Sequence, residues 1–201
     1  EPLGALDLQL RRQMQIELKR LQKHLGITFV YITHDQEEAL NMSDRIVVMR
    51  DGKFEQIGTP SEVYDNPKTS YVAQFVGSAN IISGTVCSLN EQTVIFKNKA
   101  GTGTAVRRAP DIVPGQAVNV AIRSEQIRLK PEAEKDVEGF TAVVKEKSFA
   151  GGVLQIIVSL ADGTELISTR HGIDSSLTPG DSVMVTWASE SGVLVDLEGE
   201  E

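Results

Sequence analysis

His34 could do chemistry, because it directly follows a run of β-branched and aromatic residues, 27–33. An imidazole titrates near neutral pH, so it can exchange a proton or contact an anionic ligand. The apolar run is typical of a strand buried on both faces of a parallel sheet, and ligands bind at the carboxyl ends of such strands. Taken alone, a histidine in this place is more often a structural residue.

A helix must precede this strand. Apolar residues recur at helical spacing from Leu10 to Leu25, with Asp7 as a candidate N-cap and Gly26 as the stop. A helix followed by a buried strand indicates an α/β fold.

Further elements follow His34, and each has a recognisable start or stop. Acidic residues at 35–38 open a helix, because the helix dipole favours negative charge in the first turn. Asp51-Gly52 predicts a hairpin turn, and Thr59-Pro60 predicts an N-cap followed by the first helical residue. The sequence thus predicts a helix from 35, strands at 45–50 and 53–57, and helices from 60 and at 70–75.

The character changes to short β-rich runs after about residue 80, which predicts a small all-β domain. The pattern Pro114-Gly115-x-x-Val-x-Val recurs at Pro179-Gly180, and each copy is a turn that leads into an alternating strand. This internal sequence repeat predicts two related half-units. Asp162-Gly163 predicts a further hairpin.

Composition restricts the classes of function. The 201 residues carry a net charge of −8, which opposes binding to a phosphate backbone, so we expect no nucleic-acid partner. The single cysteine, Cys87, is consistent with a reducing compartment. His24 and His171 have no ligand-spaced partners, which predicts no metal site. The Asp that follows His34 is adjacent in sequence, and no G-x-S-x-G elbow supports a hydrolase reading.

Three ordered motifs carry a family resemblance: Glu1-Pro-Leu-Gly-Ala-Leu-Asp7, Ile32-Thr-His-Asp-Gln-Glu-Glu-Ala39 and Gly58-Thr-Pro-Ser-Glu-Val-Tyr64. In that order and at those intervals the chain resembles the ATP-binding subunits of ABC importers. The second half resembles their transport-associated OB (TOBE) domain, including Ile122-Arg-Ser-Glu-Gln-Ile-Arg-Leu129, where Ser124 replaces the family's usual proline. The resemblance implies the C-terminal part of an ATPase domain at 1–79, an α/β fragment, followed by an all-β OB-like regulatory domain at 80–201.

The resemblance also implies roles for individual residues. Glu1 matches the carboxylate that orients the water attacking the γ-phosphate, and His34 matches the switch histidine that contacts this phosphate, so His34 is also the cofactor-binding residue. The cofactors of the intact subunit would be ATP and Mg²⁺. The implied D-loop, at the interface between two ATPase subunits, consists of Gly4, Ala5, Leu6 and Asp7.

The resemblance implies an intact subunit that dimerises through its ATPase and OB-like domains and drives a membrane permease fed by a solute-binding protein. It would work in the cytoplasm, at the inner face of the membrane. Residues 75–86 look most like polyamine importers. The sequence contains no G-x-x-x-x-G-K-[ST] phosphate loop and no Ser-Gly-Gly-Gln signature, so we expect this chain alone to be inactive. The alternative is a small-ligand-sensing or structural OB-type module with no ATPase role.

Overall fold

The computed structural model describes residues 7–107, 111–131, 139–172 and 175–197. The chain divides into two compact units, 1–66 and 67–201. This division lies earlier than the domain boundary predicted near residue 80. The reason is that helix α4 (Ser70–Phe75) packs on strands of the second unit rather than on the first.

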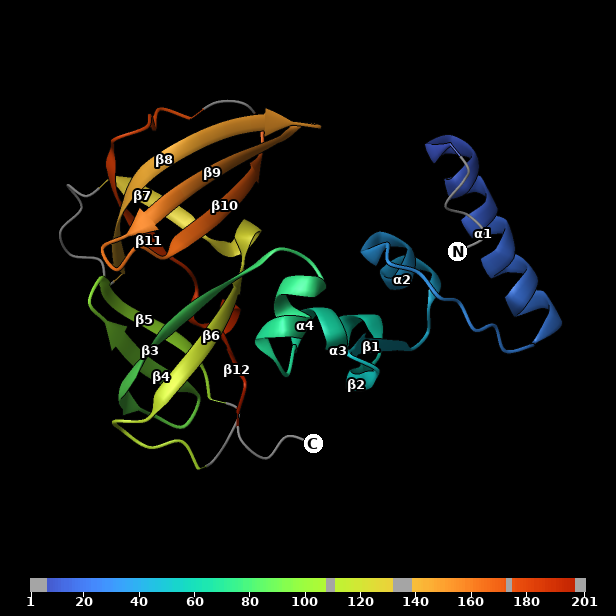
Figure 1. Ribbon diagram of the computed structural model, residues 1–201, viewed down its shortest axis with the longest axis horizontal. Coiled ribbons are helices and arrows are strands. Elements are labelled where there is room, and N and C mark those ends of the chain that lie inside the picture. Colours follow the sequence, from blue (N-terminus) through green and yellow to red (C-terminus); the bar gives the residue numbers. More distant parts are fainter. Residues whose placement is uncertain (1–6, 108–110, 132–138, 173–174, 198–201) are drawn as a thin grey trace. The chain divides into compact units, whose positions relative to one another are not determined.

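Helix α1 of the first unit, Leu8–Leu25, begins and ends where the sequence predicts (Figure 1). The Asp7 carboxylate accepts a hydrogen bond from the backbone N–H of Leu10 at 3.0 Å, which satisfies one of the unpaired donors of the first turn. Gly26 adopts the left-handed conformation at φ 64° and donates its N–H to the carbonyl of Gln22. Such a left-handed glycine commonly ends a helix.

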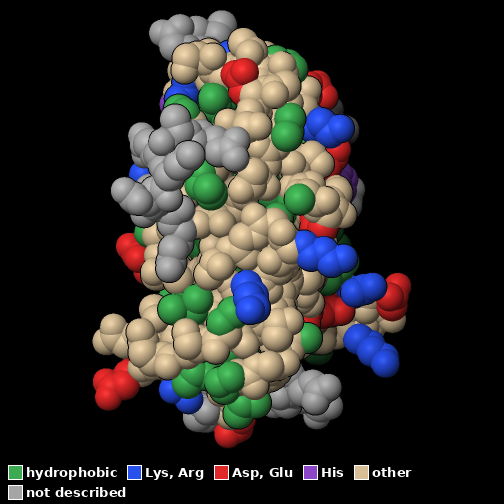
Figure 2. Space-filling view, turned by 90° about the vertical axis from the view of Figure 1, so that its left-hand side faces the viewer, with side chains coloured by type: hydrophobic (Ala, Val, Ile, Leu, Met, Phe, Trp, Pro, Cys, Tyr) green, Lys and Arg blue, Asp and Glu red, His purple; other side chains and the backbone are tan. Residues whose placement is uncertain are grey.

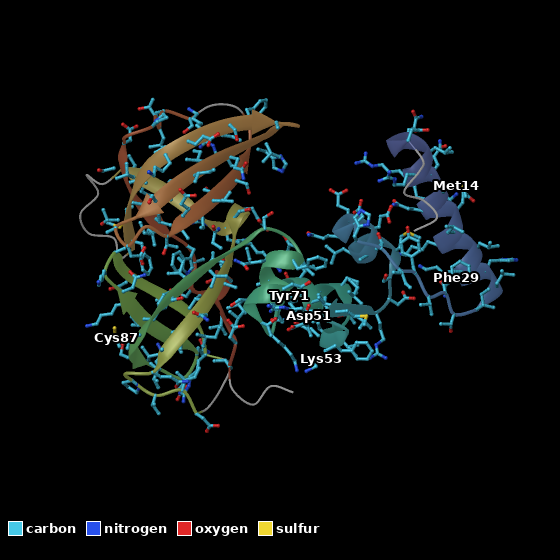
Figure 3. All side chains as sticks on the ribbon, viewed as in Figure 1. Met14, Phe29, Asp51, Lys53, Tyr71 and Cys87 are labelled. Carbon is cyan, nitrogen blue, oxygen red and sulfur yellow. The ribbon has the colours of Figure 1, made fainter. Side chains whose placement is uncertain are left out.

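The predicted strand at 27–33 is not formed, and this expectation is wrong for the structure. The segment forms no helix or strand, and in the described part of the chain no strand pairs with it. Its side chains are accordingly open: Val30 is 88% and Ile32 75% exposed, and Phe29 (Figure 3) is 43% exposed. A strand buried on both faces requires neighbouring strands that supply hydrogen bonds and cover its faces.

The rest of the first unit follows the sequence prediction. Strands β1 (Ile46–Arg50) and β2 (Lys53–Gly58) form an antiparallel hairpin, in which Asp51 and Gly52 both have positive φ. A capping box opens the next helix: Thr59 accepts from the Glu62 N–H, and the Glu62 carboxylate accepts from the Thr59 N–H. In chain order the elements are α2 (Gln36–Met42), β1 (Ile46–Arg50), β2 (Lys53–Gly58) and α3 (Pro60–Asp65).

The second unit contains α4 and a large, mostly antiparallel β system (Figure 1). Two short 3-10 helices, η1 (Ser124–Gln126) and η2 (Ser189–Ser191), each precede a short strand. Its strands are β3 (Ala79–Leu89), β4 (Thr93–Asn98), β5 (Gly101–Val106), β6 (Ala117–Arg123), β7 (Arg128–Pro131), β8 (Phe140–Ala150), β9 (Val153–Leu160), β10 (Glu165–His171), β11 (Ser182–Thr186) and β12 (Val193–Val195).

The structure confirms two related half-units. In the first, the N–H of Gly115 donates to the carbonyl of Val86 at 2.9 Å; in the second, the N–H of Gly180 donates to that of Val144 at 2.8 Å. Both glycines have positive φ, 90° and 96°. Each Pro-Gly turn therefore docks on the first strand of its own half in the same way.

The two half-units exchange their last elements. Strand β7 of the first half pairs with β11 of the second, and β12 of the second half pairs with β6 of the first. The 3-10 helices make matching contacts: the hydroxyls of Ser124 and Thr169 lie 3.0 Å apart, and those of Thr104 and Ser189 also lie 3.0 Å apart. The halves are thus interlocked rather than stacked.

The exchange closes one half and leaves the other open. Strands β3, β4, β5, β12 and β6 pair in sequence around a closed ring. In the second half β10, β9, β8, β11 and β7 pair in the matching order, but no pairing within the described residues joins β10 to β7. The core beneath both halves includes Phe96 and Phe140, each fully buried.

Candidate functional site

Most of the predicted D-loop and the predicted catalytic carboxylate lie outside the described residues: Glu1, Gly4, Ala5 and Leu6. Asp7 is described, and its side chain caps α1. The role of N-cap, one of two that the sequence suggested for Asp7, is therefore observed. Its role at a dimer interface stays a prediction.

His34 lies on an exposed bend directly before helix α2. The residues on either side hold this bend. The Thr33 hydroxyl accepts from the backbone N–H of Asp35 at 2.9 Å, and the Asp35 carboxylate accepts from the N–H of Glu38 at 3.1 Å. The imidazole is therefore presented to solvent from a backbone that is fixed at both flanks.

Glu38 supports this bend from within the unit. Glu38 is only 5% exposed, and its carboxylate accepts three side-chain hydrogen bonds. Oε2 accepts from the Tyr31 hydroxyl at 2.7 Å and from the Thr33 hydroxyl at 2.9 Å, whereas Oε1 accepts from the Gln15 amide of α1 at 3.1 Å. A buried carboxylate requires such partners, because a buried charge without them is costly.

A cationic side chain of α1 lies beside this carboxylate. The Arg11 guanidinium lies 4.0 Å from Glu38 Oε1 and 3.9 Å from Asp35 Oδ2. Burial and the hydrogen bond to Glu38 together raise the pKa of Tyr31 to about 12, because the tyrosinate would be poorly solvated and would repel the carboxylate.

Sequence reasoning missed Glu38 as a site residue. In the sequence, Glu38 is only one of several acids in the first turn of a predicted helix. Burial separates it from its neighbour, since Glu37 is exposed and Glu38 is not. The sequence does contain a signal for Glu38, because hydroxyl donors at Tyr31 and Thr33 precede it. An analysis of hydrophobic periodicity does not detect such donors.

Arg123, which lies in the motif resembling the TOBE domain, has a structural role. Its Nη1 contacts the carbonyl oxygens of Ala73 at 2.8 Å, Val76 at 2.5 Å and Gly77, all at the C-terminal end of α4. A cation at this end also complements the helix dipole.

Asp196 holds the other end of α4. Its carboxylate accepts from the Ser70 N–H at 2.8 Å, from the Ser70 hydroxyl, and from the Asn119 amide at 2.9 Å. Burial raises the pKa of Asp196, but the hydrogen bonds from Ser70 and Asn119 outweigh it and leave this pKa below its ordinary value. Helix α4 is therefore clamped to the β strands at both ends by charges of the correct sign.

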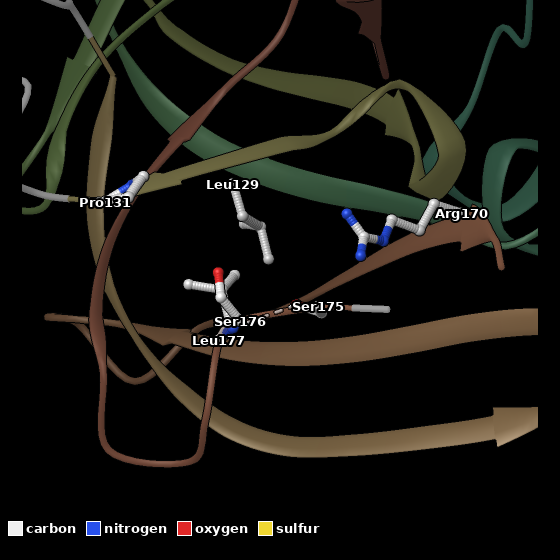
Figure 4. Close-up of a pocket in the computed structure, with 6 residues that line it drawn as sticks. All are labelled: Leu129, Pro131, Arg170, Ser175, Ser176 and Leu177. Carbon is white, nitrogen blue, oxygen red and sulfur yellow. Dashed lines mark hydrogen bonds between the residues drawn. The ribbon is translucent and has the colours of Figure 1, made fainter. Parts of the chain in front are cut away.

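An open hollow of about 530 Å³ lies at the unpaired seam of the second half (Figure 4). It is lined by Leu129, Pro131, Arg170, Ser175, Ser176 and Leu177. The Lys147 ammonium fixes one wall by donating to the carbonyls of Ser175 and Leu177. Arg170 is the single charged residue of the lining, and it is exposed, so the hollow contains no buried charged group that would select a ligand.

Three further observations concern the surface and the described residues as a set. On the face drawn in Figure 2, the Lys and Arg side chains are scattered among acidic and apolar ones rather than gathered into one basic surface. Over the described ranges, no three His, Cys, Asp or Glu side chains are grouped as metal ligands would be. No helix in these ranges has the length and apolar character needed to cross a membrane.

Comparison with known proteins finds one matching domain family and several curated relatives. Residues 120–195 match the family model of the TOBE domain. The spermidine/putrescine import ATP-binding protein PotA of Aliivibrio fischeri is 42% identical over 206 residues, covering all of this chain and 55% of that protein. PotA of Nitratidesulfovibrio vulgaris is 42% identical over 193 residues, covering 93% of this chain and 52% of that protein.

The chain therefore spans about half the length of the curated relatives it matches. Among solved structures, the cytoplasmic molybdate-binding protein ModG with molybdate bound matches with a TM-score of 0.49 and 18% identity, covering 57% of this chain and 94% of that one. The TOBE match and the observed β system agree with the expected fold class, an α/β portion followed by an OB-like β domain.

Proposed function

We propose, for a chain that contains a TOBE domain and is homologous along its whole length to PotA import ATP-binding proteins, that its intact form is the ATP-hydrolysing subunit of an ABC importer. The homology is the single observation that carries the proposal. The relatives are spermidine/putrescine import proteins, which supports these polyamines as the imported substrate.

His34 would act as the switch histidine of this subunit. Phosphoryl transfer asks a protein mainly for positioning and electrostatic stabilisation. The exposed bend before α2, with Thr33 and Asp35 held on either side, suits an imidazole that must contact a phosphate delivered from outside. Glu1 would orient the attacking water, as the family resemblance implies.

The described residues fit such a ligand only in part, because His34 is the one predicted nucleotide contact that the structure describes. ATP with Mg²⁺ would supply the phosphoryl group and neutralise the charge that develops on it. The printed sequence contains no phosphate loop, whose backbone and lysine cradle the β- and γ-phosphates. We therefore propose that this chain alone neither binds ATP tightly nor hydrolyses it.

The partners follow from the same proposal. The intact subunit would dimerise through its ATPase and OB-like domains, with Asp7 and the residues before it at the interface. It would dock on membrane permease subunits at the cytoplasmic face and would be fed indirectly by a solute-binding protein. The exposed apolar segment 27–32 would be covered in the intact subunit by further strands of the ATPase domain.

The test is steady-state ATP turnover by the full-length parent protein. We expect the equivalents of Glu1→Gln and His34→Ala to abolish turnover while ATP binding is retained. His24→Ala is the matched control, because His24 is exposed near the end of α1 and has no predicted role. Turnover that survives both substitutions would refute the two roles and favour the alternative, a structural or ligand-sensing OB-type module.

A further inference from the structure

We propose that Glu38 is a positioning residue that couples helix α1 to the bend bearing His34. The inference rests on the proposed function, because His34 is taken there as the group that contacts the γ-phosphate. It assigns to Glu38 the task of transmitting the position of α1 to that group.

The two carboxylate oxygens of Glu38 face different elements. Oε1 accepts from Gln15, at the middle of α1, and Oε2 accepts from Tyr31 and Thr33, in the segment that leads to the bend. A single rigid, planar group therefore spans both elements. Because Glu38 is 5% exposed, water competes poorly for either oxygen.

Thr33 continues this connection into the bend. Its hydroxyl donates to Glu38 and accepts from the Asp35 N–H, so one side chain joins the carboxylate to the residue that follows His34. The Asp35 carboxylate returns to the Glu38 N–H. The hydrogen bonds form a closed loop, and a displacement of Glu38 must move the backbone on both sides of the imidazole.

Helix α1 connects the other side of Glu38 to Asp7. The Asp7 side chain caps the first turn, and the helix runs without a break for 18 residues. A continuous helix moves as a rigid element, so a shift of the loop at Asp7 reaches Gln15 directly. If Asp7 lies at the subunit interface, Glu38 ties closure of that interface to the position of His34.

The test uses the full-length parent protein with the equivalent of Glu38→Gln, which keeps shape and removes charge. We expect kcat to fall about tenfold to a hundredfold, since small misplacements of a reacting group cost this much, with KM for ATP nearly unchanged. Glu37→Gln is the matched control, because Glu37 is the adjacent, exposed acid of the same helix turn. Tyr31→Phe removes one donor and should give a smaller loss of kcat.

A spectroscopic signature distinguishes positioning from simple unfolding. In the 201-residue chain with isotope-labelled tyrosine, Glu38→Gln should lower the pKa of Tyr31 from about 12 toward its ordinary value of 10.0, with the helical content of α1 retained. If the variant loses this helical content, Tyr31→Phe decides by itself: a loss of kcat at constant KM supports the proposal, and unchanged kcat refutes it.

The outcomes separate this inference from the proposed function. Loss of turnover in His34→Ala and Glu38→Gln, but not in Glu37→Gln, supports both. If His34→Ala abolishes turnover while Glu38→Gln behaves like Glu37→Gln, the coupling is refuted and the proposed function stands. If His34→Ala has no effect, the proposed role of His34 and the inference fall together.

Discussion

The clamp on helix α4 gives a prediction whose magnitude follows from the structure. Arg123→Met keeps an unbranched apolar stem but removes the guanidinium that contacts the carbonyls of Ala73, Val76 and Gly77. These carbonyls belong to the helix end, where intrahelical partners are missing. The substitution therefore leaves the C-terminal end of α4 without its cation.

The expected loss is about 2–4 kcal/mol in the free energy of unfolding of the second unit. Hydrogen bonds from a charged donor contribute about 1.5–3 kcal/mol, and the charge at the helix terminus adds about 0.3–1 kcal/mol. The loss has a ceiling, because α4 can detach once the clamp fails. Detachment exposes Val72 and Val76, which are 0% and 5% exposed, and each buried valine contributes about 1.5–3 kcal/mol.

Urea denaturation followed by tryptophan fluorescence measures this loss. Trp187 is the single tryptophan of the chain, and it stacks on Phe140 in the second unit at 5.5 Å between ring centroids. Its emission therefore reports this unit. Arg128→Met is the control, because Arg128 is exposed and should change stability by about 0.5 kcal/mol or less. Equal effects of the two substitutions would refute the clamp.

Three further predictions concern the other polar contacts. The pKa of Asp196 is held below its ordinary 3.8, so the stability that the ionised carboxylate contributes is present above pH 3.8 and is lost as pH falls through the folded pKa. Asp196→Asn should therefore weaken the dependence of stability on pH in acid, as measured by Trp187 fluorescence. The pKa of Tyr31 is raised from 10.0 to about 12, so the stability that protonated Tyr31 contributes is complete below pH 10 and is lost as pH rises through about 12. Tyr31→Phe should therefore lack this alkaline loss of structure when unfolding is followed by circular dichroism. Asn80 is 7% exposed and pairs with both backbone groups of Ile167, at 2.9 and 2.6 Å, so Asn80→Leu should destabilise the second unit by about 1–3 kcal/mol per unpaired group in urea denaturation.

Local signals in the sequence predicted the local structure well. Asp7, Gly26 and the Thr59-Pro60 step each mark an element boundary that the structure confirms. These predictions succeed because a cap or a turn depends on the chemistry of a few adjacent residues. The Pro-Gly repeat at 114 and 179 likewise predicts two half-units, and each turn docks on the first strand of its own half in the same way.

Non-local features were beyond the sequence for a physical reason. The apolar run 27–33 predicts a buried strand, but burial requires partners that periodicity cannot supply, and the segment forms no strand and is largely exposed. The sequence also gives no sign that β7 and β12 are exchanged between the two halves. A short strand carries the same alternation whether it pairs with its own half or with the other one.

The contrast between Arg123 and Glu38 shows what decides the role of a charged residue. Arg123 lies in a motif that invites a functional reading, yet its guanidinium is occupied by three carbonyls of α4. Glu38 is marked in the sequence only by the hydroxyl donors that precede it, yet its burial and its donors on two separate elements place it beside the His34 bend. A charged group that contacts one helix end stabilises that helix, whereas one shared between two elements makes their positions depend on each other. The sharing of partners, rather than the motif, is therefore the property that points to a role in coupling.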